Sequence, residues 1–265
     1  MKRFLQKKAF IVWAMLFFMT LTVLVPKIYG EENAESSTSE EANRKKVVYL
    51  TFDDGPSPNN TRKIIDVLNK EGVKATFFLI GQEAENRPHI VRDLVDNGMT
   101  VLPHSYSHKT NYIYKSSSNY ISDYEKCKEV LEHIVRGPLP NYMRMPTGSY
   151  TPCCNKWVMQ DIIKGLRSKD VSYIDWNVST DDSLGKNVPV ENLKNKFIKQ
   201  AKDKDFIVVL MHDSYYCGTT VTYLPEMIKY LKDNGYEFKT INDMTPEDEA
   251  YMKNHRLINK TKKVK

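Results

Sequence analysis

The sequence predicts an α/β protein with a parallel sheet, arranged either as a (β/α) barrel or as a doubly wound sheet. Strand-like and helix-like segments alternate from about residue 46 to residue 245, the pattern of parallel strands joined by helical crossovers. Some strand-like segments, such as 206–211, are apolar throughout, as expected of strands buried on both faces. The 265 residues are enough for one barrel domain.

Each predicted element carries a local signal. The run at 47–50 is β-branched and aromatic, and Gly55-Pro56 ends it. Asn59 is expected to cap the first helix, which ends near Gly72. In chain order, strands are expected at 47–50, 75–80, 100–102, 142–145, 171–178, 206–211 and 238–241. Helices are expected at 59–72, 90–97, 121–134, 157–166, 193–201 and 224–231.

One folded domain is expected at 46–245, after an export segment and a spacer. Residues 1–30 have a basic start and an uncharged, mostly apolar stretch at 9–25, which indicates a signal peptide or an N-terminal membrane anchor. Both alternatives place the rest of the chain outside the cytoplasmic membrane. Residues 31–45 are rich in Glu, Ser, Asn and Ala, as in a flexible polar spacer, and 246–265 are interpreted as a basic C-terminal tail.

The net charge of +6 does not indicate nucleic-acid binding, because much of it lies at the two ends and no nucleic-acid motif accompanies it. Membrane contact is expected only through the N-terminal segment. Cys127 falls in the helical stripe at 121–134, so we expect it in the core. Cys153 and Cys154 are adjacent and lack metal-site spacing, and a disulfide from one of them to Cys217 stays open.

Chemically active side chains recur directly after the predicted strands. They are Asp53 and Asp54; His104, Ser105 and His108; Arg144, Pro146 and Gly148; Asp175, Trp176, Asp181 and Asp182; and His212 and Asp213. The carboxyl ends of parallel strands meet on one face of an α/β fold. Residues far apart in sequence are therefore expected to converge there.

Two histidines and a carboxylate in this set have the composition of a catalytic zinc site, which also suits other divalent transition metals. His104 and His108 are four residues apart, a spacing that points both imidazoles the same way on one helical turn. Asp53 and Asp54 are adjacent, so on a strand they point to opposite faces. One is then expected to bind metal while the other acts as a base.

The remaining candidates have more than one interpretation. His212 ends a buried apolar strand and suits a general acid, the alternative being a core histidine with a partner. Arg144, taken alone, is interpreted as a structural ion-pair partner. Trp176 and Tyr150 either stack on a sugar ring or fill the core.

Five segments, in order, resemble the motifs of the polysaccharide deacetylase family, carbohydrate esterase family 4 with the NodB-homology domain. They are Thr51-Phe-Asp-Asp-Gly-Pro-Ser57, His104-Ser-Tyr-Ser-His108, Arg144-Met-Pro-Thr-Gly148, Asp175-Trp-Asn-Val-Ser-Thr-Asp-Asp182 and Val209-Leu-Met-His212-Asp213. The resemblance covers about residues 46–245, and the arrangement of spacer and domain looks like that of peptidoglycan deacetylases from Gram-positive bacteria.

The resemblance implies a distorted (β/α) barrel and a divalent metal, usually zinc, with cobalt or nickel as alternatives. It implies that Asp54, His104 and His108 bind the metal. It further implies that Asp53 is the catalytic base, oriented by Arg144. His212 would be the catalytic acid, with Asp182 as its partner, and Leu210 would line the pocket for the acetyl methyl group.

The implied reaction is hydrolysis of N-acetyl groups on a cell-wall glycan, with peptidoglycan N-acetylglucosamine favoured. Chitin-like and poly-N-acetylglucosamine chains are alternative substrates, and a catalytically weak glycan-binding protein is the alternative of another class. The implied location is extracytoplasmic, secreted or anchored at the outer face of a bacterial membrane. The sequence departs from the family at Ser183, where many members have Trp, and at Leu102-Pro103, where Gly-Asn is frequent.

Overall fold

The computed structural model describes residues 45–260, so the predicted export segment and most of the predicted spacer lie outside the described residues. The folded part is one compact unit that begins at Lys46. Within 45–260, no helix is both long enough and apolar enough to cross a bilayer.

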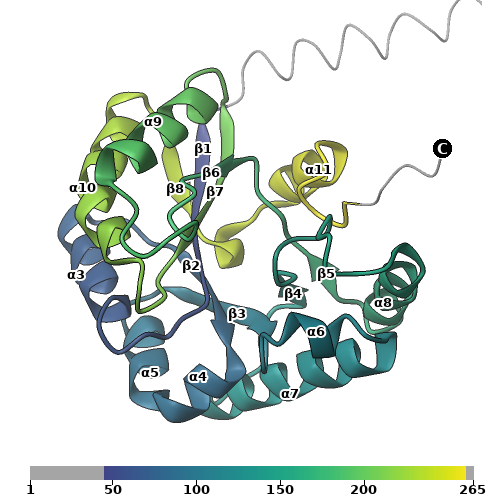
Figure 1. Ribbon diagram of the computed structural model, residues 1–265. Coiled ribbons are helices and arrows are strands. Elements are labelled where there is room, and N and C mark those ends of the chain that lie inside the picture. Colours follow the sequence, from purple (N-terminus) through teal and green to yellow (C-terminus); the bar gives the residue numbers. More distant parts are fainter. Residues whose placement is uncertain (1–44, 261–265) are drawn as a thin grey trace, which may run out of the picture. The chain divides into compact units, whose positions relative to one another are not determined.

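A parallel sheet with a short second sheet organises the domain (Figure 1). The main order is β3-β2-β1-β7-β6, and β8 also pairs with β1. The strands of the main sheet are β1 (Val47–Asp53), β2 (Thr76–Ile80), β3 (Thr100–Ser105), β6 (Val178–Ser179), β7 (Phe206–His212) and β8 (Glu237–Lys239). The second sheet pairs β4 (Tyr142–Met143) with β5 (Ser172–Tyr173). All pairs between these strands are parallel, as the alternation predicts.

Helices cover the sheet on the outside, with α3, α9 and α10 along one flank and α5 and α7 along another (Figure 1). The helices are α3 (Thr61–Glu71), α4 (Gly81–Asn86), α5 (Pro88–Asp96), α6 (Thr110–Ile113), α7 (Ser117–Val135), α8 (Lys156–Ser168), α9 (Val190–Ala201), α10 (Gly218–Asp233), the 3-10 turn η1 (Ile241–Asp243) and α11 (Pro246–Asn254). Their apolar faces bury Leu68, Leu131 and Phe197 against the sheet, and these three side chains have no exposed surface. This burial holds the strand ends that carry the site.

Strand β1 lies at the centre of the sheet and fixes the geometry of the site. It is buried along its whole length, between β7 on one side and β2 and β8 on the other. Its register places Thr51 opposite Leu210 and Asp53 opposite His212. Two residues 159 positions apart in sequence therefore end neighbouring strands at the same level.

The predicted strand at 171–178 was wrong as a single element. The structure has β5 and β6 in different sheets, separated by residues that bond elsewhere. The Asp175 amide donates to the Leu257 carbonyl at 2.8 Å, and the Asn177 side chain bonds the β7 backbone at Phe206 and Val208. No glycine or proline marks this break, and its local sign in the sequence is the pair of polar residues Asp175 and Asn177.

The prediction that the domain ends at residue 245 and a tail follows was also wrong for residues 246–258. Helix α11 packs onto the domain, and Met252, Leu257 and Ile258 are buried in a second apolar cluster with Tyr49. Ile258 also forms an antiparallel bridge with Ile174. Only these few apolar side chains stand among many charged ones, so the segment resembled a solvated tail.

We expect Met252→Ala to lower the free energy of unfolding by about 2–5 kcal/mol, because it leaves a cavity under α11. Lys253→Ala on the same helix is the matched control, since it removes only an exposed pair with Glu249 worth about 0.5 kcal/mol. Urea unfolding of both variants measures the difference. Equal stability of the two would show that this segment is not part of the cooperative fold.

Two smaller expectations also differ from the structure. Helix α3 begins after Asn60 rather than Asn59, and the Ser57 hydroxyl accepts from the Asn60 and Thr61 amides at 3.1 and 3.3 Å. All four cysteines are free, so the disulfide to Cys217 is not present. Cys127 is buried, as its helical stripe predicts.

Candidate active site

The end of β1 delivers two carboxylates through an unusual backbone. Asp53 is the last residue of the strand, whereas Asp54 has a positive φ of 75° and so leaves the strand direction. The Gly55-Pro56 bond is cis. A Cβ on Gly55 would lie 2.0 Å from Asp213 Oδ2, so only glycine fits there. The positive φ of Asp54 explains why the simple alternation of strand side chains does not separate the two carboxylates.

Asp54, His104 and His108 form the one group of metal-ligating side chains found among residues 45–260. Asp54 Oδ1 lies 3.4 Å from His104 Nε2 and 3.3 Å from His108 Nε2. Asp54 Oδ1 is buried and has no hydrogen-bond partner within the described part of the chain. Three ligand atoms that face one another, one of them an unsatisfied buried oxygen, are suited to a cation.

The tautomer of His104 follows from its other ring nitrogen. His104 Nδ1 lies 2.9 Å from the Arg144 carbonyl, which can only accept, so Nδ1 carries the proton. The lone pair is then on Nε2, which faces Asp54. A histidine ligand oriented in this way by a backbone carbonyl is typical of metal sites.

The charge states of this cluster also suit metal binding. Burial raises the pKa of Asp54, but the neighbouring imidazoles, beginning with His104, outweigh burial and hold the pKa well below its usual range. Burial lowers the pKa of His108, with Asp54 opposing the shift in part. A charged carboxylate beside a neutral imidazole is the form that coordinates a metal.

Asp123 of α7 holds the loop between the two histidines and was not among the predicted site residues. Its carboxylate accepts from the Ser105 hydroxyl at 2.5 Å, the Tyr106 amide at 2.8 Å, and the Ser107 amide and hydroxyl at 3.0 and 2.6 Å. Ser105 Oγ in turn accepts from the His108 amide at 2.9 Å. The available sequence signal was an acidic residue one helical turn before Cys127, on the face of the helix that the apolar residues occupy.

The two histidines are not on a helix, which corrects the helical-turn interpretation of their spacing. His104 lies in β3, and His108 lies in the following turn with a φ of 52°. Their rings nevertheless approach to 5.1 Å between centroids, because the turn held by Asp123 brings His108 back over the strand end.

Arg144 is fully buried and pairs with Asp53. Its Nη1 donates to Asp53 Oδ1 at 2.8 Å and to the Thr51 hydroxyl at 2.6 Å, and its Nε donates to the Ile174 carbonyl at 3.0 Å. Asp53 Oδ2 faces the Asp54–His104–His108 group and lies 4.0 Å from His104 Nε2. The guanidinium therefore fixes which carboxylate oxygen faces the cluster.

His212 and Asp182 form a second buried pair. Asp182 Oδ1 lies 2.8 Å from His212 Nδ1, while Oδ2 accepts from the His212 amide at 2.8 Å and the Thr220 hydroxyl at 2.6 Å. Burial alone lowers the pKa of His212, but the hydrogen bond and charge of Asp182 reverse this and raise it to about 9. His212 is therefore an imidazolium at neutral pH, with both ring nitrogens protonated, and its Nδ1–H donates to Asp182.

The three residues predicted to contact substrate make contacts within the protein. Leu210 is nearly buried at the end of β7. Trp176 packs over the Gly148 backbone, with the Arg144 guanidinium 5.6 Å from its ring centre. The Tyr150 hydroxyl accepts a hydrogen bond from Arg256, in the segment after α11. These contacts hold the three side chains against the rest of the domain. Their contact with substrate stays a prediction.

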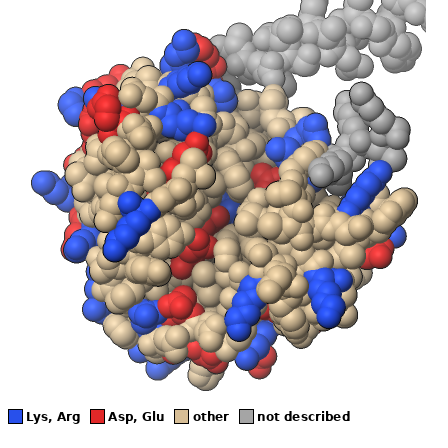
Figure 2. All heavy atoms as spheres, viewed as in Figure 1, with Lys and Arg blue, Asp and Glu red and all other residues tan. Residues whose placement is uncertain are grey.

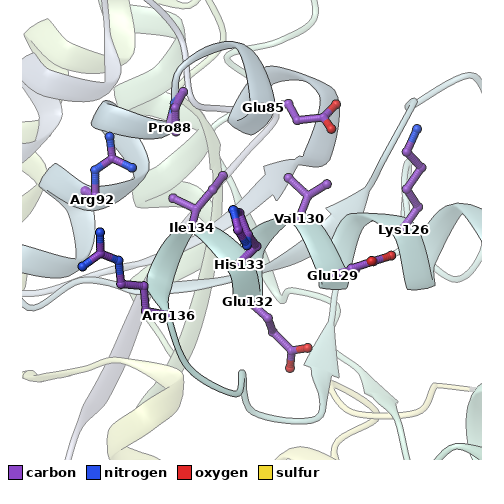
Figure 3. Close-up of a pocket in the computed structure, with 10 residues that line it drawn as sticks. All are labelled: Glu85, Pro88, Arg92, Lys126, Glu129, Val130, Glu132, His133, Ile134 and Arg136. Atoms are coloured by element: carbon purple, nitrogen blue, oxygen red, sulfur yellow. The ribbon is translucent and has the colours of Figure 1, made fainter.

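A groove of about 460 Å³ opens beside the cluster and includes Asp54 and His108 in its walls. Acidic side chains gather near the middle of the face seen in Figure 2, with basic side chains mainly around its edge. A surface pocket of about 950 Å³ lies elsewhere, between the α4–α5 region and α7 (Figure 3). It contains none of the predicted site residues, so its volume does not mark the chemistry.

The polysaccharide deacetylase family model matches residues 40–160. A peptidoglycan-N-acetylglucosamine deacetylase of Bacillus cereus is 30% identical over 227 residues, covering 82% of this chain and 77% of that protein. The peptidoglycan-N-acetylglucosamine deacetylase PgdA of Listeria monocytogenes is 32% identical, covering 84% of this chain and 44% of that protein. The catalytic domain of a peptidoglycan N-acetylglucosamine deacetylase from Eubacterium rectale superposes with a TM-score of 0.69 at 30% identity, covering 77% and 92% of the two chains.

The chain belongs to the polysaccharide deacetylase family. The predicted enzyme class, a polysaccharide deacetylase, and the predicted distorted (β/α) barrel of the NodB type are both confirmed. A carbohydrate esterase family 4 pseudoenzyme from Bacillus anthracis is also similar, at 26% identity and a TM-score of 0.64, covering 75% of this chain and 65% of that one. Because this neighbour is described as a pseudoenzyme, the residues that the chain presents at its site also bear on its activity.

Proposed function

We propose that this chain is a metal-dependent enzyme that removes N-acetyl groups from peptidoglycan N-acetylglucosamine. The observation that carries the proposal is the unsatisfied Asp54 oxygen between His104 and His108, beside two separately positioned groups, Asp53 and His212. The substrate is supported by the names of the B. cereus, L. monocytogenes and E. rectale relatives.

Asp54, His104 and His108 would hold the metal, with zinc first and cobalt or nickel as alternatives. Two imidazoles and one carboxylate form a donor set that zinc accepts while keeping a position open for water or substrate. When bound, such a metal supplies Lewis-acid polarisation of the amide carbonyl and lowers the pKa of water.

Asp53 acts as the base in this proposal. Arg144 donates to Oδ1, so Oδ2 is left to accept a proton from the attacking water. Oδ2 faces the Asp54–His104–His108 group. The Arg144 side chain is itself held by Thr51 and the Ile174 carbonyl, so Asp53 is positioned before substrate binds.

His212 acts as the acid. Asp182 binds Nδ1, so Nε2 is the nitrogen left to donate a proton to the departing amine. A pKa of about 9 keeps His212 protonated at neutral pH, which is the form that an acid requires. The products are acetate and a glucosamine unit.

Asp182→Asn tests the His212 pair through its pH dependence. The pKa of His212 is raised from 6.5 to about 9 in the folded protein, so its contribution to stability is fully present below pH 6.5 and is lost as the pH rises through 9. The difference corresponds to about 3 kcal/mol. Burial also raises the pKa of Asp213 to about 7 and raises the pKa values of Cys127 and Cys217. Wild type and variant both carry these groups, so the difference between their stability curves from about pH 7.5 to 9.5 reports on His212.

We expect metal-free wild type to lose stability across that interval and metal-free Asp182→Asn to lose much less, as measured by urea unfolding at several pH values. The basic limb of the pH–rate profile should move to lower pH in the variant. Parallel stability curves for the two proteins would contradict the assigned pair.

Acetate release tests the substrate. We expect the fastest release from peptidoglycan, with N-acetylmuramic acid, chitin oligosaccharides and poly-N-acetylglucosamine behind it. If the metal-loaded protein binds glycan but releases acetate from none of the four substrates, the proposed enzymatic activity is wrong and a glycan-binding role is favoured.

We further propose that the domain works outside the cytoplasmic membrane, secreted or anchored through residues 1–30. The support is the basic, then apolar, N-terminal sequence. Protease accessibility of the domain in intact cells tests this location.

A further inference from the structure

The groove beside the Asp54–His104–His108 group has two chemically different walls. It is lined by Asp54, Pro56, Ser57, Pro58, Ile80, Glu83, Arg87, His108, Ser214, Tyr215 and Tyr216. Glu83 and Arg87 form an ion pair on the α4 side, and this wall offers charged hydrogen-bonding groups. The wall after β7 presents tyrosines. In the proposed function the acetyl group reacts beside Asp54 and His108, which line one part of this groove.

Tyr215 is an exposed aromatic side chain in that second wall. Five large apolar side chains stand out as exposed among residues 45–260, namely Val95, Tyr112, Trp157, Leu184 and Tyr215. Of these five, Tyr215 is the one that lines the groove, and 69% of its surface is exposed. An exposed ring beside a catalytic cluster is available for contact with a ligand.

The backbone under Tyr215 is fixed from neighbouring elements. The Asn59 side chain donates to the Tyr215 carbonyl at 2.9 Å, and the Asn60 side chain donates to the Ser214 carbonyl at 2.7 Å. The Tyr216 carbonyl accepts from the Asn187 amide at 3.0 Å, and the Tyr216 ring packs edge-on against Tyr215 at 5.3 Å and 84°. Because the backbone is fixed and one neighbouring ring packs against Tyr215, the side chain loses less conformational entropy on ligand binding than one on a mobile loop.

Sugar rings match these two walls. A pyranose has an apolar face of C–H groups, which packs on an aromatic ring, and an equator of hydroxyl and amide groups, which bonds charged side chains. Ser214 also connects the tyrosine wall to the cluster, because its hydroxyl lies 3.4 Å from Asp54 Oδ2. The tyrosine wall is therefore adjacent to the metal-ligand candidate Asp54.

We propose that Tyr215 determines specificity by stacking on the sugar next to the one that loses its acetyl group. This inference rests on the proposed function and deepens it, since it makes a chain of at least two sugars a better substrate than a free amino sugar. The contact is made equally in the ground and transition states, so it lowers KM and leaves kcat unchanged.

The test compares Tyr215→Ala, Tyr215→Phe and Trp157→Ala in the full, metal-loaded chain. Trp157 is the matched control, because it is equally exposed at 69% and lies outside the groove. With the tetramer of N-acetylglucosamine, we expect Tyr215→Ala to raise KM about tenfold at constant kcat, while Tyr215→Phe and Trp157→Ala stay near wild type. Turnover of the monomer should not change in any variant.

Two results would overturn the inference while wild type still releases acetate. One is an unchanged KM for the tetramer in Tyr215→Ala, and the other is an equal loss on the monomer, which would mean a disturbed centre. If wild type releases no acetate from any glycan, the proposed function fails separately. Calorimetric titration of the tetramer then decides the inference, because equal affinity in wild type and Tyr215→Ala would exclude the stacking contact.

Discussion

Replacing Asp53 by Asn is expected to reduce acetate release by about 10²–10⁴-fold while the protein still binds one metal ion. Asparagine keeps the shape of the side chain but cannot accept the proton from water. Asp54, His104 and His108 are untouched, so the metal content should remain at the wild-type level. Acetate release and elemental analysis of the same preparation measure the two effects.

The control for Asp53→Asn must address the burial of Arg144. Removing the partner of a fully buried guanidinium destabilises the fold by about 3–5 kcal/mol, so thermal unfolding must show that the variant is folded at the assay temperature. Asp213→Asn is the matched variant, a buried carboxyl at the neighbouring strand end that bonds Thr61 rather than Arg144. We expect it to retain most activity. An equal loss in both variants would assign the effect to packing and remove Asp53 as the base.

Replacing His104 by Ala is expected to abolish metal binding and activity together. The imidazole supplies one of three ligand atoms, and it is oriented by the Arg144 carbonyl in a nearly fully buried position. Removing a chelator and adding zinc should restore chelated wild type and should not restore the variant. Metal stoichiometry and acetate release, measured before and after zinc addition, check this result.

His133→Ala is the matched control for His104→Ala, because His133 is exposed on α7 and lines the separate pocket of Figure 3. We expect wild-type metal content and rate from it. Full metal content in His104→Ala would contradict the ligand set, and zinc-independent turnover by that variant would contradict metal dependence itself.

Much of the fold was predictable because its signals are local. The apolar run of β1 and its Gly55-Pro56 ending required no tertiary information, and the same holds for the apolar β7 that ends in His212. Strand ends in a parallel sheet meet on one face, so Asp53, Asp54 and His212 could be expected together before any distance was known. The register that pairs Asp53 with His212 gives this expectation its geometry.

What the sequence could not predict depends on contacts between distant segments. The break between β5 and β6 is made by Asn177 bonding β7 and by Asp175 bonding Leu257. Asp123 acts on the histidine loop from a helix 18 residues beyond Ser105. Tyr215 became distinctive only through its position in the groove, since its neighbours in sequence are polar or aromatic in a similar way.

The most direct test of the central claim is acetate release from purified peptidoglycan by the chelator-treated wild-type protein, before and after stoichiometric zinc is added. We expect no release from the metal-free protein and restored release with zinc, in step with zinc bound at the Asp54–His104–His108 cluster. Full release by protein shown to be metal-free, or none from fully zinc-loaded protein, would contradict it.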